Sequence, residues 1–237
     1  MQIVQPPGAV SILAIAAHPD DIESWCAGTL ALAIEGGATV RLLLVTSGES
    51  GSADPQAMPE LVAACREVEA REAAARLGIE EVAFLRYPDG DVENTRALRS
   101  DLVAWIRRWR PAVLFTHDPE QPWPPYLSHR DHRSVGRAAL DAAYPLARDR
   151  LAFAEHERDG LLPHTISAVW LFASSTADTY IDIASSLEHK LAARLAHASQ
   201  TIDPAVLVTS WRDRAARIGA PLGLAAAEAF TILQLEP

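Results

Sequence analysis

Two short segments of this chain bring together histidines and aspartates, the residue types that bind metal ions and transfer protons. The first is His18-Pro19-Asp20-Asp21 and the second is His129-Arg130-Asp131-His132. Neutral imidazole and carboxylate are ordinary zinc ligands, and three protein ligands with an open fourth position are typical of a catalytic zinc. The two segments therefore predict one hydrolytic zinc site, although Fe(II) or Co(II) accepts the same ligand types.

Each segment has a simpler explanation when it is taken alone. Pro and Asp favour turns, Asp21 suits a helix N-cap, and Asp131 suits the first turn of a helix. Asp20 and Asp21 are neighbours, so we expect one to face a metal and the other a water, in an order that spacing does not decide. His129 and His132 share a helix face if the helix begins early.

Alternating strand and helix patterns place both segments at predicted strand ends, and this placement favours a site over the simpler explanations. A nearly continuous apolar run over 10–17 ends at His18 and predicts a buried parallel strand. The further strands are expected at 39–46, 81–85, 112–116, 168–173, 179–182 and 230–235. The helices are expected at 22–34, 59–77, 95–109, 132–143, 187–199 and 205–218, with a long loop holding four prolines at 117–130.

The alternation predicts an α/β fold with right-handed crossovers and a mostly parallel sheet. Ligands bind at the carboxyl ends of such strands, which is where His18 lies. We expect one domain over residues 1–237, because no linker or repeat divides the chain. The remaining histidines are expected at surface or core positions, with a minor alternative in which His117 lines the site.

The composition of the chain limits the classes of partner and the cellular compartment that we expect for it. The formal net charge is -10 and no basic run is present, so a nucleic-acid surface is not expected. Cys26 and Cys65 are too few for a disulfide framework, which favours reduced thiols in the cytoplasm. Residues 1–8 lack the features of a signal peptide, and the apolar stretches are too short to span a membrane. The first strand is followed by no G-x-G-x-x-G phosphate loop.

The order of several motifs resembles the LmbE-like (PIG-L) zinc deacetylases of N-acetylated sugars. The resemblance covers most of the chain and rests on AAHPDDIE (16–23), TSGESG (46–51), Arg66-x-x-Glu69 with LGI (77–79), FLRYPDGD (84–91), LFTHDP (114–119), SHRDHRSVG (128–136) and DIASSLEHKLAARLAHASQ (182–200). It implies a Rossmann-like sheet flanked by helices and a metal-dependent hydrolase that removes an N-acetyl group from an amino sugar or a GlcNAc-containing conjugate.

The resemblance also implies a separate role for each site residue. It implies zinc bound by His18, Asp21 and His132, with Asp20 as general base. It places His129 at the residue that stabilises the oxyanion or protonates the leaving amine, with Asp131 orienting and charging His129. The residues placed at sugar contacts are Glu49, Arg66 and Asp89.

Two departures from the family pattern bear on the substrate. Arg130 stands where the usual His-Pro-Asp-His signature has proline, and Ser24-Trp25-Cys26-Ala27 replaces a glycine-rich run. Bulky Trp25 either narrows the pocket or packs in the core. Two other functions remain open: a zinc amidase acting on a mycothiol-like S-conjugate, and a non-catalytic ligand-binding protein on the same sheet. Self-association is left open by the sequence.

Overall fold

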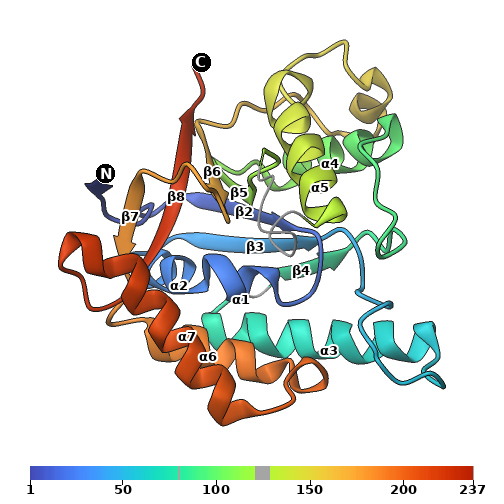
Figure 1. Cartoon of the computed structure of the whole chain (residues 1–237). Coiled ribbons are helices and arrows are strands. Elements are labelled where there is room, and N and C mark those ends of the chain that lie inside the picture. The colour runs from blue at the N-terminus through green and yellow to red at the C-terminus, as the bar shows by residue number, and fades with distance from the viewer. Residues whose placement is uncertain (80, 121–128, 237) are drawn as a thin grey trace.

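The computed structural model describes residues 1–79, 81–120 and 129–236, and its strands form one mostly parallel sheet (Figure 1). The strand order in this described part is β1-β7-β8-β6-β5-β2-β3-β4, and β8 alone runs antiparallel to its neighbours β6 and β7. The strands are β1 (Gln2–Ile3), β2 (Ser11–Ala16), β3 (Thr39–Leu44), β4 (Glu81–Phe84), β5 (Val113–His117), β6 (Ala168–Phe172), β7 (Thr179–Asp182) and β8 (Ala227–Gln234).

Helices cover both faces of this sheet (Figure 1). One layer contains α1 (Asp21–Trp25), α2 (Ala27–Glu35), α3 (Pro59–Leu77), α6 (Leu187–Ala196) and α7 (Pro204–Gly219). The other contains α4 (Arg96–Trp109), α5 (Arg130–Asp141) and the single-turn helix Ala142–Leu146. Short 3₁₀ turns lie at Ala154–Asp159, Ala198–Gln200 and Ala220–Leu222.

The alternation of side chains along β2 explains the two layers. Successive residues of a strand point to opposite faces. Ile12 and Ala14 accordingly belong to the core under α2 and α3, whereas Leu13 and Ile15 belong to the core under α4 and α5. All four are buried, as the continuous apolar run predicts.

Most predicted elements are confirmed within a residue or two, and the differences have local causes. The helix expected over 22–34 is broken at Cys26 into α1 and α2, because the Cys26 backbone is non-helical. The helix expected at 132–143 begins two residues earlier, at Arg130. The structure adds the two-residue strand β1. Residues 121–128 of the predicted loop 117–130 lie outside the described residues.

The carboxyl ends of β2, β3 and β5 meet at one edge of the sheet, and the following loops gather there. β2 lies between β3 and β5 in parallel register. The helix α5 lies close over this edge because residue 136 is glycine: a Cβ there would meet the His117 carbonyl oxygen closer than real Cβ contacts allow. Among the described residues, no helix is long and apolar enough to cross a membrane.

Candidate metal and catalytic site

The first predicted segment turns sharply between the end of β2 and the start of α1. Asp20 has φ 94, a left-handed backbone conformation that non-glycine residues rarely adopt. The turn brings the Asp21 carboxylate back to its own loop, where Oδ2 accepts the His18 backbone N–H at 2.8 Å. This compact turn fixes His18 and Asp21 as neighbours and leaves Asp20 on a separate side of it.

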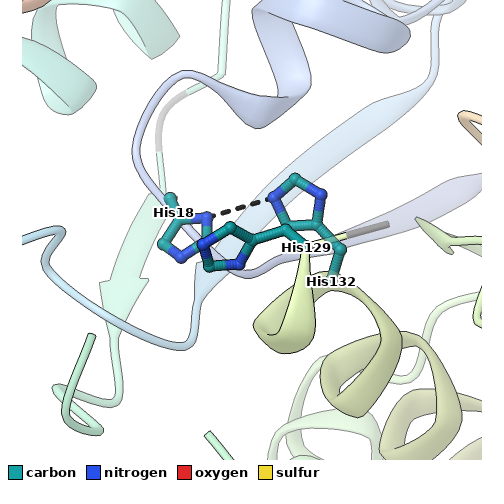
Figure 2. A group of neighbouring side chains, drawn as sticks. All are labelled: His18, His129 and His132. Atoms are coloured by element: carbon teal, nitrogen blue, oxygen red, sulfur yellow. Dashed lines mark hydrogen bonds between the residues drawn. The ribbon is translucent and has the colours of Figure 1, made fainter. Parts of the chain in front are cut away.

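The second segment reaches the same place from α5. His129 is the N-cap of α5, and its Nδ1 accepts the Asp131 backbone N–H at 3.2 Å. The ring of His18 lies 4.8 Å from that of His129 and 5.1 Å from that of His132, measured between centroids. Figure 2 shows the three imidazoles gathered between the two segments. Residues more than a hundred positions apart in the sequence thus form one cluster.

The side chains of His18, Asp21 and His132 form a cluster that we call the donor triangle, in which each side chain has a nitrogen or oxygen atom within 3.4 Å of the other two. His18 Nδ1 lies 3.2 Å from His132 Nε2 (Figure 2) and 3.4 Å from Asp21 Oδ2, and His132 Nε2 lies 3.1 Å from Asp21 Oδ1. Zinc–nitrogen bonds of about 2.0–2.1 Å in tetrahedral geometry separate adjacent ligands by roughly 3.3 Å. The donor types and their separations therefore fit a zinc-sized cation.

Two other histidines, His117 and His129, have ring nitrogens close to these donor atoms. His117 lies within 4.8 Å of Asp21 and His132, as His129 does of His18 and His132. However, His117 Nε2 accepts the Ala17 backbone N–H at 3.1 Å, and its ring stacks on His132 with 4.1 Å between centroids. His117 is therefore better described as a buried residue whose ring packs against His132 and fixes the orientation of that ring.

The site is electrostatically prepared for a cation. Burial disfavours charge on His18, but hydrogen bonds to Asp131, Asp21 and Asp89 outweigh it and raise its pKa to about 12. Burial also opposes charge on Asp21, yet the neighbouring His132 and His117 hold the pKa of Asp21 well below its usual range. Carboxylates thus surround His18 in their ionised form, and they would stabilise positive charge placed between them.

The Asp131 carboxylate has a different partner from the expected one. We predicted that it orients His129, but its Oδ2 lies 3.1 Å from His18 Nε2. The same carboxylate accepts the backbone N–H groups of Gly90 at 2.7 Å and Val92 at 3.1 Å. The main-chain N–H of Asp131, rather than its side chain, is hydrogen-bonded to the His129 ring.

Asp20 lies between two arginines that come from separate helices. Its Oδ1 is 3.4 Å from Arg66 Nη2 on α3, and its Oδ2 is 3.7 Å from Arg194 Nη2 on α6. Burial and the Asp21 charge raise the pKa of Asp20, while Arg66, Arg194 and His197 act in the opposite direction. A carboxylate held in this way, with a raised pKa, is suited to accept a proton.

The three predicted sugar contacts all lie at the site, where they also join its loops. Arg66 donates to the carbonyl oxygens of Gly48 at 2.8 Å and Pro19 at 2.6 Å. Glu49 Oε1 accepts the Asp89 backbone N–H at 2.8 Å. Asp89 Oδ1 in turn lies 3.0 Å from His18 Nε2. These contacts hold the loops after β3 and β4 against the segment 18–21.

The two departures from the family pattern are located as follows. Arg130 contacts the loop that follows Asp89, through the Gly90 carbonyl oxygen at 3.2 Å, the Asp91 carboxylate and Glu93 at 3.0 Å. Trp25 packs against the core, and its ring lies 4.8 Å from the Arg214 guanidinium. The packing alternative is therefore the one that the structure favours for Trp25.

The sequence interpretation underrated two positions. In the sequence His117 directly follows the apolar run 112–116, as His18 follows the run 10–17, and this signal would have placed His117 at the site; in the structure it is the last residue of β5. Arg194 gave no such signal, because it lies in the middle of α6 and reaches Asp20 only through tertiary packing.

Comparison with known proteins shows the family to which this chain belongs. The family PIG-L, described as GlcNAc-PI de-N-acetylase, matches residues 13–143, which include both predicted segments. The chain belongs to the PIG-L family. The PIG-L match extends from β2 to the turn after α5, so it contains the donor triangle but not Arg194.

Individual relatives extend the similarity beyond the PIG-L match. Diacetylchitobiose deacetylase of Thermococcus kodakarensis is 31% identical over 80% of this chain and 69% of its own length. A 1D-myo-inositol 2-acetamido-2-deoxy-alpha-D-glucopyranoside deacetylase of Nakamurella multipartita is 34% identical over 57% of this chain and 55% of its own length. The solved N,N'-diacetylchitobiose deacetylase of Pyrococcus horikoshii superposes with a TM-score of 0.89 at 28% identity, covering 95% and 84% of the two chains.

Proposed function

We propose that this chain is a zinc-dependent deacetylase that hydrolyses the N-acetyl group of a small amino sugar or GlcNAc-containing conjugate. The observation that carries the proposal is the triangle of His18, Asp21 and His132 donors, with Asp20 and His129 beside it. Membership of the PIG-L family and the named activities of the relatives support the substrate class.

When bound, zinc supplies a Lewis acid for the acyl oxygen and lowers the pKa of water from 15.7 to about 7. His18, Asp21 and His132 would hold the ion. Asp20 accepts the proton of the attacking water, since its carboxylate lies outside the donor triangle and is fixed by Arg66 and Arg194.

His129 is suited to the developing oxyanion. Burial and the neighbouring His18 and His132 lower its pKa, so the ring is neutral near pH 7. Because Nδ1 accepts the Asp131 backbone N–H, the proton of the neutral ring lies on Nε2. His129 is exposed, so its Nε2–H can donate a hydrogen bond to the oxyanion. Asp20, once it has accepted the proton of the water, can supply that proton to the departing amine.

Asp89, Glu49 and Arg66 are the residues we propose at the sugar. Asp89 and Glu49 lie on the loops beside His18, with Glu49 partly exposed and the Asp89 side chain nearly buried, and Arg66 is buried close to both loops. The carboxylates suit hydrogen bonds from sugar hydroxyl groups, whereas Arg66 acts through the loop carbonyls that it holds.

The proposal is tested by measuring acetate released from N-acetylated sugars and S-conjugate amides, with zinc and with a chelator. We expect Asp20→Ala to retain zinc while losing most turnover. Loss of one oxyanion donor costs on the order of 3 kcal/mol, so His129→Ala should reduce kcat roughly a hundredfold. Activity near the wild-type level in Asp20→Ala would exclude Asp20 as the base, and absence of stoichiometric metal from active protein would exclude the metal-dependent reaction.

A further inference from the structure

The two ring nitrogens of His18 face different surroundings. Nδ1 points to the donor triangle, where His132 Nε2 and Asp21 Oδ2 lie 3.2 and 3.4 Å away. Nε2 points to the opposite side, where carboxylate oxygens of Asp89 and Asp131 lie 3.0 and 3.1 Å away. An imidazole that offers Nδ1 to a metal carries its proton on Nε2, and that proton needs an acceptor.

Asp131 is the more rigid of the two acceptors. Its side chain has no solvent exposure, and it receives the Gly90 and Val92 backbone N–H groups in addition to His18. Asp89 lies on the loop that we propose contacts the sugar, and its other oxygen accepts the Ser50 N–H at 3.0 Å. A bound sugar would therefore compete with His18 for the Asp89 carboxylate, whereas the buried Asp131 carboxylate would not contact the sugar.

We infer that Asp131 is a positioning residue for the metal ligand His18 rather than for His129. Metal-binding histidines commonly donate their second N–H to a carboxylate, which fixes the ring and raises its basicity, and loss of that partner typically weakens metal affinity by 10–100-fold. The inference rests on the metal site of the proposed function but not on its substrate or its general base.

The substitution Asp131→Asn tests the inference. In the wild-type protein Oδ2 accepts from His18 and Gly90 while Oδ1 accepts from Val92, so both oxygens are acceptors. An asparagine amide offers one oxygen and one NH₂, and the NH₂ must face an N–H donor whichever way the amide is turned. Either way the negative charge beside His18 Nε2 is lost, which removes the charged acceptor that raises the basicity of the ring. If the NH₂ takes the Oδ2 position, His18 also loses this acceptor and keeps only Asp89.

The measurement is the dissociation constant for Zn(II), obtained by competition with a chromophoric chelator. We expect Asp131→Asn to weaken zinc binding at least tenfold and His129→Ala to leave it within about threefold. Arg130→Ala is the matched control for the loop, because Arg130 contacts Gly90 without touching His18. The inference would be overturned if Asp131→Asn kept the wild-type zinc affinity while its kcat fell as far as that of His129→Ala. That result would mean that Asp131 positions His129.

A second measurement uses the wild-type protein, so it does not depend on the variant folding. In protein loaded with ¹¹³Cd(II), imidazole ¹⁵N spectra should show metal coupling at Nδ1 of His18 and a slowly exchanging proton on Nε2. Coupling at Nε2 would refute the inference. A protein that binds metal in the expected way but releases no acetate would refute the proposed function and leave the role of Asp131 intact.

Discussion

Gly136 in the middle of α5 lets the helix carrying His129 and His132 lie against the end of β5, and Gly136→Ala should displace both histidines. A Cβ at residue 136 would lie 3.2 Å from both the His117 carbonyl carbon and the Pro119 nitrogen, and closer still to the His117 oxygen. The obstacle is backbone, and the adjacent Asp118 N–H is bonded to the Phe172 oxygen at 3.0 Å. The helix must therefore move, by roughly 1 Å if ordinary van der Waals contact near 3.4 Å is to be restored.

Two opposing effects determine how far Gly136→Ala changes the free energy of unfolding. Replacing a glycine inside a helix by alanine stabilises by roughly 0.5–1 kcal/mol, whereas overpacking a well-packed contact costs about 1–3 kcal/mol. The balance runs from no net change to a net destabilisation of about 2.5 kcal/mol, or a fall in Tm of up to roughly 10 °C for a chain of this size. A displacement of about 1 Å at a catalytic group can reduce rate on the order of a hundredfold, so kcat/KM should fall much more than stability.

The assay combines thermal unfolding with acetate release and zinc affinity. Arg137→Ala is the matched control, because Arg137 is the exposed neighbour of Gly136 in α5 and its ion pair with Glu120 lies at the surface. We expect this control to stay within about 1 kcal/mol of the wild-type protein. A Gly136→Ala variant with raised Tm and unchanged kcat/KM would refute the reasoning, since helix propensity would then outweigh the backbone contact.

Two further predictions concern buried charges outside the donor triangle. Lys190→Met leaves Glu228 buried without its ion pair, so the free energy of unfolding should fall by about 3–5 kcal/mol; urea unfolding measures this, and a loss below 1 kcal/mol would contradict it. Arg86 donates to Glu67 and lowers the pKa of that carboxyl. Glu67→Gln should therefore destabilise by about 1 kcal/mol or less at pH 7, with the difference fading as pH falls below about 4.3 through the lowered folded-state pKa. A stability difference between the wild-type protein and Glu67→Gln that grew as the pH fell would contradict this prediction.

The fold class and the two segments rich in His and Asp could be recognised from the sequence alone, because both depend on local patterns. The apolar run over 10–17 gives a strand buried on both faces, and the β-α alternation gives a parallel sheet whose carboxyl ends meet. The glycine after Leu77 marks the end of α3 at its predicted residue, since Gly78 adopts a left-handed C-cap. The two His/Asp segments were predicted to form one metal site, and the structure brings their side chains together.

Only the tertiary structure shows which side chains at the site contact one another. Asp131 precedes His132 in the sequence, yet its carboxylate turns to His18 and to two amides of the loop 90–92. Asp20 meets Arg194 from a helix more than 160 positions away, and His117 joins the site because β5 lies beside β2. Such contacts depend on side-chain direction and on the register between distant elements. Local sequence patterns predict where a strand ends, but they do not predict which distant side chain lies opposite that end.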